Sequence, residues 1–322
     1  MKALTVVLCF VAMLTRVPAW AEPPRDPANF LFLDADDASD HRDMLARTDI
    51  AGAQIIYNWK MLEPQKDRYD FSKIERDLRF ADSLHKKLFI IVADRFFYPG
   101  SRNVPAYLLT DPAYHGGLVS QRDNPESSTG WVAMQWIPAV RHRFQRLLHA
   151  LAGRFDGRLY GINIGETAMD ADLKEGEKSF TCDGYFAAEM ENIAFTRKVF
   201  RETFVVLDAN FWPCGWNNDH HYMSRAFAYA AAHGIGMGGP DIVPFNKAQM
   251  KNSYPFLHDY RGRLKLVAMG VQEPTLEYIN PETGKPFTKD EFVSFARDYL
   301  GVDIIFWAYI SPWLQKPAPP GP

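Results

Sequence analysis

Three things are scarce in this sequence of 322 residues: cysteine, unbalanced charge and long hydrophobic runs. The formal net charge is −3 and the basic residues are scattered, so the sequence gives no support for nucleic-acid binding. Of the three cysteines, Cys9 lies near the N-terminus. Cys182 and Cys214 have no second cysteine or histidine at metal-ligand spacing, so we expect no metal site there. A disulfide between these two cysteines and a pair of free thiols are both compatible with the sequence.

The long apolar run, residues 3–14, lies at the N-terminus and has the layout of a secretory signal peptide. Lys2 precedes it, and Arg16 and Pro18 end it too early for a membrane span. Small residues then indicate cleavage near Ala21. We therefore expect a secreted or periplasmic protein with no stable membrane insertion. Cleavage would remove two basic residues and no acid, which lowers the net charge from −3 to −5.

Apolar runs typical of strands alternate with amphipathic runs typical of helices along the chain. Such alternation predicts a parallel sheet with helices outside it. The strand-like runs are residues 29–36, 52–59, 87–97, 159–167, 203–212, 234–242, 264–273 and 302–311. Eight strands with helical crossovers predict an α/β fold of the (β/α)8, or TIM-barrel, type. A doubly wound open sheet is disfavoured, because the first run leads into LDADDASD and not into a glycine-rich phosphate turn.

The remaining patterns define the helices and the domain limits. The clearest helical segments cover residues 70–87, 137–155, 185–204 and 289–301. We expect a signal peptide at 1–21, a single barrel domain at 22–314 and a proline-rich disordered tail at 315–322. Two connections are long, residues 98–136 and 212–226, and in a barrel both would lie on the catalytic face.

Polar side chains occur where the strand-like runs end, and in a barrel these ends converge over the mouth. Glu166 and Glu273 end the fourth and seventh runs, which are otherwise apolar. A carboxylate at a buried strand end is costly unless it is satisfied or functional. Glycosidic bond cleavage needs two carboxyl groups, one to protonate the leaving oxygen and one to attack the anomeric carbon. An ion pair with Arg95 or a helix-capping role is the structural alternative for either glutamate alone.

Ten further residues are candidates for binding a sugar, because they lie at the strand ends or in the long loops. Carboxylates, amides and imidazoles would hydrogen-bond hydroxyl groups, and aromatic rings would stack on the sugar. These candidates are Asp34, Trp59, Asp94, Asn163, Asp208, Asn210, Trp212, His221, Trp307 and Tyr309. The adjacent His220 and His221 also permit a weaker interpretation as a metal-dependent hydrolase, although a pair of neighbouring histidines is a poor metal signature.

One part of the sequence is similar to a known enzyme superfamily. The segment NWKMLEPQKDRYDFSKIERDLRFADSLHKKLFI resembles the second βα unit of clan A retaining glycoside hydrolases. VPAYL and VRHRFQRLLHALAGRFDGRLYGINIGET continue the similarity to Glu166. GVQEP is similar to the strand-seven ending that bears the nucleophile, and FWAYIS to strand eight. The order of strands and helices is similar over residues 29–313, whereas the similarity of the sequence itself is specific only over residues 55–167.

The resemblance implies a retaining glycosidase that acts on a poly- or oligosaccharide without a cofactor. Glu166 would be the general acid/base, Glu273 the nucleophile, and Trp307 would stack on the sugar. Clan members usually carry Asn directly before the acid/base glutamate, where this chain has Gly165. That departure favours a second hypothesis, a catalytically inactive barrel that binds carbohydrate. The sequence leaves the sugar, the linkage and the oligomeric state open.

Overall fold

The computed structural model describes residues 25–98, 100–122, 129–169, 179–215 and 218–318. The expected signal peptide and its cleavage site near Ala21 lie outside these residues. Within the described ranges, no helix is both long and apolar enough to cross a lipid bilayer.

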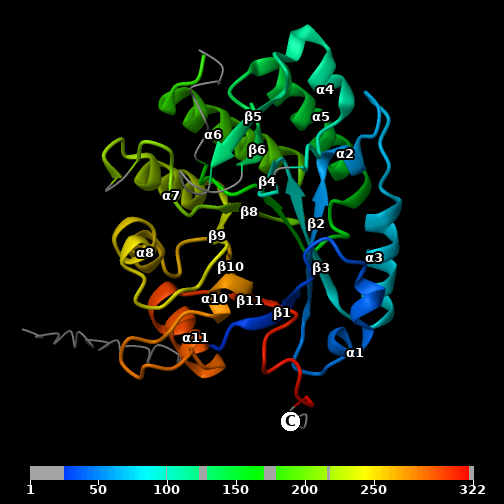
Figure 1. Cartoon of the computed structure of the whole chain (residues 1–322). Coiled ribbons are helices and arrows are strands. Elements are labelled where there is room, and N and C mark those ends of the chain that lie inside the picture. Colours follow the sequence, from blue (N-terminus) through cyan, green and yellow to red (C-terminus); the bar gives the residue numbers. More distant parts are fainter. Residues whose placement is uncertain (1–24, 99, 123–128, 170–178, 216–217, 319–322) are drawn as a thin grey trace, which may run out of the picture.

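Eight parallel strands close into a barrel in the order β1-β11-β10-β9-β8-β7-β3-β2 (Figure 1). This confirms the predicted (β/α)8 fold, and each barrel strand overlaps one of the eight apolar runs. The strands are β1 Ala28–Phe32, β2 Gly52–Asn58, β3 Lys87–Ala93, β7 Gly161–Ile164, β8 Phe204–Asp208, β9 Gly236–Gly239, β10 Val267–Val271 and β11 Ile304–Ala308.

Alternation of side chains along the strands divides the apolar core into two layers. The inner layer fills the barrel with Phe30, Phe32, Phe89, Val206, Leu266, Ala268, Ile304 and Phe306. The rings of Phe89 and Phe306 meet edge to face, with centroids 5.2 Å apart. The outer layer lies between strands and helices and includes Leu31, Ile55 and Trp307. Strand register therefore decides which side chains face the barrel interior and which face the helices.

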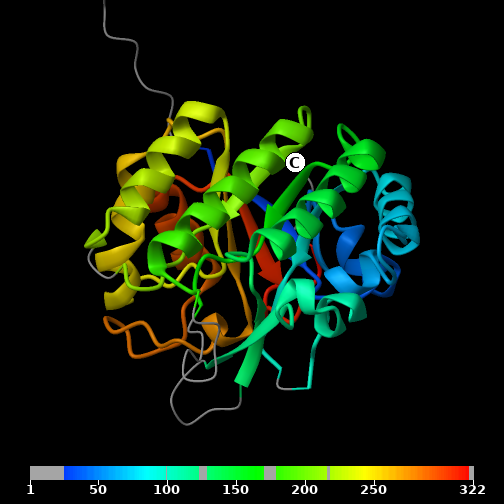
Figure 2. The same ribbon diagram turned by 90° about the horizontal axis from the view of Figure 1, so that it is seen from above.

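The helices lie outside the strands, as Figure 2 shows. The local sequence determines where several helices start. Thr288 and Glu291 form a capping box at the start of α11. Pro138 is the first residue of α5, a position where the missing amide hydrogen costs little because it would have no partner within the helix. The expected segments 70–87, 137–155, 185–204 and 289–301 correspond to α3, α5, α6 and α11. A π-helical turn, Ala296–Leu300, continues α11. The helices are α1 Arg42–Leu45, α2 Trp59–Leu62, α3 Ser72–Ser83, α4 Ala106–Thr110, α5 Pro138–Phe155, α6 Cys182–Val199, α7 Tyr222–His233, α8 Lys247–Asn252, α9 Tyr254–Asp259, α10 Glu273–Leu276 and α11 Lys289–Phe295.

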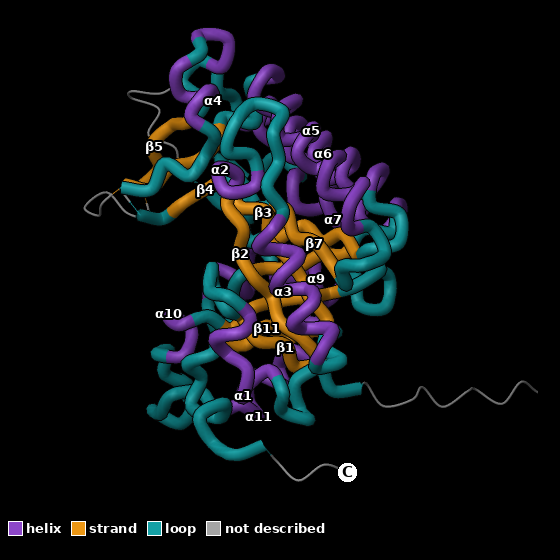
Figure 3. The backbone as a smooth tube through the Cα atoms, turned by 90° about the vertical axis from the view of Figure 1, so that its right-hand side faces the viewer, coloured by secondary structure: helices purple, strands orange, loops and turns teal. Residues whose placement is uncertain are grey.

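The connection after β3 forms a small antiparallel sheet that the apolar pattern does not predict. Its order is β4-β6-β5, with β4 at Arg95–Phe96, β5 at Leu118–Arg122 and β6 at Thr129–Ala133. Figure 3 shows β4 and β5 on the same side of the barrel as α10. Because β4 follows β3 after one residue, the two read as one strand-like run in the sequence. The sheet holds the residues that follow β3 against the mouth of the barrel.

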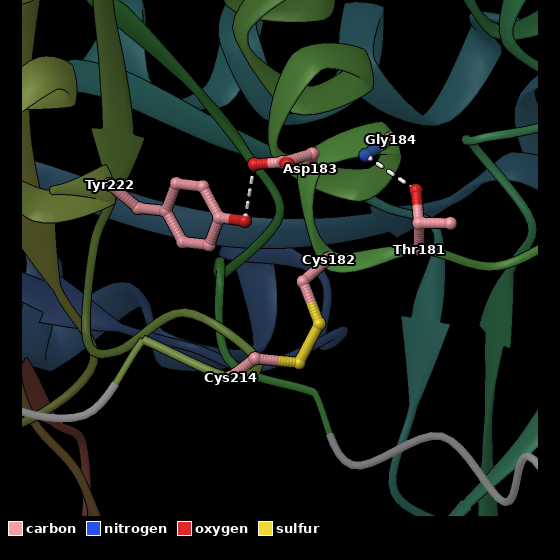
Figure 4. Close-up of a disulfide and its surroundings, with 6 residues drawn as sticks. All are labelled: Thr181, Cys182, Asp183, Gly184, Cys214 and Tyr222. Atoms are coloured by element: carbon pink, nitrogen blue, oxygen red, sulfur yellow. Dashed lines mark hydrogen bonds between the residues drawn. A yellow bond between two sulfur atoms is a disulfide. The ribbon is translucent and has the colours of Figure 1, made fainter. Parts of the chain in front are cut away.

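Cys182 and Cys214 are joined by a disulfide, with Cα atoms 6.1 Å apart (Figure 4). The bond ties the first residue of α6 to the loop that follows β8. Beside it, Tyr222 donates a hydrogen bond to Asp183 Oδ1 at 2.7 Å. The structure thus decides between the two states of these cysteines that the sequence allows.

The start of the C-terminal tail is bound to the barrel. The sequence predicts a disordered tail from residue 315, yet Gln315 Nε2 donates to Tyr309 O at 2.8 Å. The carbonyl oxygen of Lys316 accepts a hydrogen bond from Arg47. Residues 319–322 lie outside the described part of the chain.

Candidate active site

Glu166 follows β7 by two residues and stands half-buried at the mouth of the barrel. Asn210 Nδ2 donates to its Oε1 at 2.9 Å. The next residue, Thr167, holds the turn in place, because its backbone nitrogen donates to Asp208 O and its hydroxyl to Phe211 O. Glu166 is therefore fixed against the loop that follows β8.

Gly165 has no room for a side chain. A Cβ atom there would lie 2.7 Å from Asp94 Oδ1 and 2.9 Å from Arg95 Nε. Asp94 cannot easily move away, since its other oxygen accepts a 2.9 Å bond from Gln135 Nε2 and both residues are buried. Glycine before Glu166 is therefore a packing requirement of this barrel, where the glycosidase pattern has Asn.

Arg95 supports the backbone that carries Glu166. Its Nη1 donates to Ala168 O at 3.3 Å and to Tyr185 Oη at 3.2 Å, and Tyr185 in turn donates to Thr167 O at 3.1 Å. The carboxylates within ion-pair distance of Arg95 are Asp94 at 3.2 Å and Glu189 at 3.5 Å. Among the described residues, Arg95 therefore forms its ion pairs with Asp94 and Glu189. The structural alternative for Glu166, an ion pair with Arg95, is not observed in this part of the chain.

Asp208, the last residue of β8, lies beside Glu166. Asn163 Nδ2 donates to its Oδ1 at 2.8 Å, and Gln54 Nε2 donates to Asn163 Oδ1 at 3.0 Å. On the other side, a Cβ on Gly238 would lie 2.6 Å from Asp208 Oδ1, so the carboxylate occupies the space that this glycine leaves. Burial raises the pKa of Asp208 well above its usual value, and the charge of Glu166 raises it further.

Glu273 follows β10 and is the first residue of α10. It lies close enough to Asp34, which follows β1, for its charge to act on that carboxyl. Burial is the main cause that raises the pKa of Asp34, and the charges of Glu273 and Asp36 add to it. Glu166 and Glu273 therefore stand at the same end of the barrel, after β7 and β10, with β8 and β9 between them.

Three tryptophans expected at the mouth belong to the core, and the expectation that they bind sugar is wrong. Trp307 is 0% exposed, faces the helices, and donates its Nε1 hydrogen to Asn29 Oδ1 at 2.8 Å. Trp59 is buried and donates to Glu63 Oε2 at 2.9 Å. Trp212 is buried against the rings of α6 and α7. Strand register turns Trp307 outward, away from the mouth.

The other sugar-binding candidates divide into three groups. Asn163 and Asp94 are buried with both polar ends bonded inside the protein, so they position Asp208 and the Glu166 turn and do not contact a ligand. Asp34, Asp208 and Asn210 lie beside the two glutamates, as described above. Tyr309 is half-buried against His41, and His221 is exposed at the start of α7.

Six large apolar side chains are exposed among the described residues: Phe97, Tyr98, Phe245, Tyr278, Ile279 and Ile310. Phe97 and Tyr98 follow β4 of the small sheet, and the other four follow the carboxyl ends of barrel strands. Tyr98 is 70% exposed, after β4. Phe245, after β9, has a backbone φ of 64°, which is unusual for a bulky residue. In the sequence these residues do not stand out, since Phe97 and Ile310 lie in the apolar runs 87–97 and 302–311, and nothing in the pattern indicates which side chains are exposed.

The described residues contain no group of three or more His, Cys, Asp and Glu side chains that could hold a metal ion. The ring of His220 is stacked on the ring of Tyr222, with the two ring centroids 5.1 Å apart. The interpretation as a metal-dependent hydrolase thus gains no support from this part of the chain.

Solved glycoside hydrolases have the same fold. The catalytic domain of β-amylase from Paenibacillus polymyxa has a TM-score of 0.59 and 8% identity, over 88% of this chain and 92% of that one. Xylanase 10B from Thermotoga petrophila RKU-1, in complex with xylobiose, has a TM-score of 0.51 and 11% identity, over 88% and 82%. Xylanase B from Clostridium stercorarium F9 has a TM-score of 0.50 and 9% identity, over 88% and 86%. No family model and no curated protein matches the sequence. The chain therefore shares its barrel fold with these glycoside hydrolases.

Proposed function

We propose that this protein is an exported glycoside hydrolase that cleaves O-glycosidic bonds in a poly- or oligosaccharide by a retaining mechanism. The main support is the placement of Glu166 and Glu273 after β7 and β10, at one end of a closed barrel whose fold is that of glycoside hydrolases. Asn210 Nδ2 donates to Glu166 Oε1 at 2.9 Å, which orients the carboxyl group from the loop after β8.

The proposed reaction has two steps. In the first, Glu166 gives its proton to the leaving oxygen while Glu273 attacks the anomeric carbon, so the glycosidic bond breaks and a glycosyl ester forms. In the second, Glu166 takes a proton from water, the water oxygen bonds to the anomeric carbon, and Glu273 is released. The two inversions retain the configuration, and the two carboxyl groups supply the proton and the nucleophile without a cofactor.

The exposed apolar side chains that follow the strands support a substrate longer than one sugar. Tyr98 lies after β4, and Phe245 and Tyr278 lie after β9 and β10. Exposed aromatic rings on a soluble protein commonly mark a binding surface, and their flat faces suit stacking on sugars. We therefore expect catalytic efficiency to rise with the length of the oligosaccharide, and Tyr98→Ala to reduce this rise.

The proposal is tested by screening oligosaccharides and polysaccharides for release of reducing ends and following the anomeric form of the first product by proton NMR. Retention is expected. Glu166→Gln and Glu273→Gln should each lower kcat by about 100-fold or more, with unchanged circular dichroism. The matched control is Glu277→Gln, an exposed glutamate of the same loop as Glu273, which should keep full activity. Full activity in either glutamine variant, or inversion, would contradict the assignment.

A barrel that binds carbohydrate without cleaving it is the second candidate, favoured by Gly165 in place of Asn. It predicts sugar binding by calorimetry that is the same in wild type and in both glutamine variants, with no reducing ends released. The packing around Gly165 weakens this candidate, because the close approach of Asp94 and Arg95 is by itself a sufficient reason for a glycine at this position.

Export through the N-terminal segment is part of the proposal. The Cys182–Cys214 disulfide supports it, since disulfides persist mainly in oxidising compartments. The test is to express the full chain in a bacterium and determine the N-terminal residue and the compartment of the product. Residue 22 as the first residue, in the periplasm or medium, is expected, and an intact N-terminus in the cytoplasm would contradict it.

A further inference from the structure

The Cys182–Cys214 disulfide joins α6 to the loop after β8, and both of these elements hold the Glu166 turn, residues 165–168. We propose that this disulfide is a positioning element for Glu166, so that the chain reaches full activity only after the bond has formed. This inference rests on the proposed function, because it assigns the disulfide a role in the same reaction. That role goes beyond the contribution of the bond to stability.

The first support of the Glu166 turn is α6, which holds it through Tyr185. This side chain is buried near the start of the helix. Its hydroxyl donates to Thr167 O at 3.1 Å and accepts from Arg95 Nη1 at 3.2 Å. Cys182 is the first residue of the same helix. The place of the Tyr185 hydroxyl therefore depends on where the N-terminal end of α6 lies.

The second support is the loop that follows β8. Thr167 Oγ1 donates to Phe211 O at 2.8 Å, and Asn210 Nδ2 donates to Glu166 Oε1 at 2.9 Å. Cys214 lies three residues after Phe211 and has a backbone φ of 61°, which is uncommon for a residue other than glycine. Such a conformation persists where the surrounding structure holds it, and the disulfide is one such constraint.

The other contacts between the two supports are weaker constraints on position. Trp212 of the loop packs against Phe186 and Tyr185 of α6, with ring centroids 4.8 Å and 6.2 Å apart. Apolar contacts of this kind are non-directional, so they hold the two elements together and still permit small shifts. The disulfide fixes the Cα atoms of Cys182 and Cys214 6.1 Å apart (Figure 4). The covalent bond therefore sets the relative position of the two supports.

Reduction removes this constraint. A dithiol such as dithiothreitol supplies two electrons and two protons, the S–S bond breaks, two thiols form, and the dithiol becomes a cyclic disulfide. The loop then holds Asn210 and Phe211 less firmly, and Glu166 lies out of line with the leaving oxygen for part of the time. The chain would therefore have low activity in a reducing cytoplasm and full activity in an oxidising compartment.

The expected effect is on kcat more than on KM. A misplacement of about 1 Å in a catalytic group can lower the rate by roughly 100-fold, so a partial loosening should lower kcat by about 10-fold. KM should stay within about 2-fold, because the exposed aromatic side chains proposed to bind the sugar follow β4, β9 and β10, outside both supports. A disulfide that acted on stability alone would leave both constants unchanged in the folded protein.

The first test compares kcat and KM of the oxidised wild type, the wild type reduced with dithiothreitol, and Cys182→Ser/Cys214→Ser, under conditions in which circular dichroism shows that all are folded. The two disulfide-free forms should show the same fall in kcat, reoxidation should restore the wild type, and dithiothreitol should not affect the double variant further. The matched control is Tyr222→Phe, which removes the hydrogen bond to Asp183 beside the disulfide and should keep kcat. Wild-type kcat in the folded double variant would overturn the proposal.

The support from α6 can be tested with the disulfide intact. Tyr185→Phe keeps the ring and removes the hydroxyl that donates to Thr167 O. This variant should lower kcat several-fold with little change in KM. A wild-type kcat would show that α6 does not hold the Glu166 turn, and it would overturn the proposal even if the double serine variant failed to fold.

The last test needs no substrate. Hydrogen exchange followed by mass spectrometry should be faster after reduction in peptides covering residues 161–169, and unchanged in peptides covering β10 and β11 at 267–271 and 304–308. No acceleration at 161–169 would overturn the proposal, and so would equal acceleration in all three, which would show a general loss of stability. If the exchange result holds and no substrate is cleaved, the disulfide positions the Glu166 turn and the proposed function fails.

Discussion

The space around Gly165 allows a sharp prediction about the residue that most distinguishes this chain from the glycosidase pattern. In Gly165→Ala, the new Cβ atom would lie 2.7 Å from Asp94 Oδ1 and 2.9 Å from Arg95 Nε, closer than such contacts normally are. Both residues are buried and bonded to Gln135, Ala168 and Tyr185, so the contact cannot be relieved by rotating a free side chain. Overpacking of this kind costs about 1–3 kcal/mol of unfolding free energy.

The loss in activity should exceed the loss in stability. Arg95 supports the carbonyl of Ala168 in the turn that carries Glu166, so a shift of Arg95 displaces the carboxyl group. A misplacement of about 1 Å in a catalytic group can lower the rate by roughly 100-fold. Gly165→Asn, which introduces the residue of the glycosidase pattern, should therefore lower the proposed activity more than Gly165→Ala does.

Urea unfolding and kcat/KM of the purified variants provide the measurement, with Gly153→Ala as the matched control. Gly153 lies on the exposed side of α5, and nothing stands within 4 Å of the position its Cβ would take. This variant should gain about 0.5–1 kcal/mol, since alanine is the better helix former. The unfolding free energy should therefore fall in Gly165→Ala and rise in Gly153→Ala. Wild-type stability and activity in Gly165→Ala would show that Asp94 and Arg95 move freely, and would refute the packing argument.

Three further predictions concern the surroundings of the site. Asn210→Ala should lower kcat/KM by about 10- to 100-fold, because Glu166 loses a hydrogen bond to a charged group, and activity equal to wild type would contradict that role. Reduction of the Cys182–Cys214 disulfide, which closes a loop of sequence separation 32, should cost about 3–4 kcal/mol in urea unfolding, and an unchanged midpoint would exclude a stabilising disulfide. Burial raises the pKa of Glu189 from 4.5 to about 8, so the folded state binds an extra proton between these values and stability falls as pH rises through that window. Glu189→Gln should flatten this fall in unfolding measured from pH 4.5 to 8, and an equally steep fall would show that Glu189 is not its source.

The sequence by itself determined the barrel and the placement of the two glutamates along it. Eight apolar runs separated by amphipathic segments leave few alternatives to a parallel barrel, because each buried strand needs a helical crossover to reach the next. A glutamate at the end of an apolar run is visible as a break in that pattern, so the sequence alone marks Glu166 and Glu273. The pattern also marked most barrel strands to within a few residues.

Only the tertiary structure decided which side chains meet at the mouth. Trp307 lies in a strand as expected, yet register turns it toward the helices, and a shift of one residue would have turned it inward. The pairing of Cys182 with Cys214, the contact of Gly165 with Asp94, and the position of Asp208 beside Glu166 all join separate segments of the chain. Such contacts depend on how strands are aligned and packed, and local sequence carries no record of that alignment.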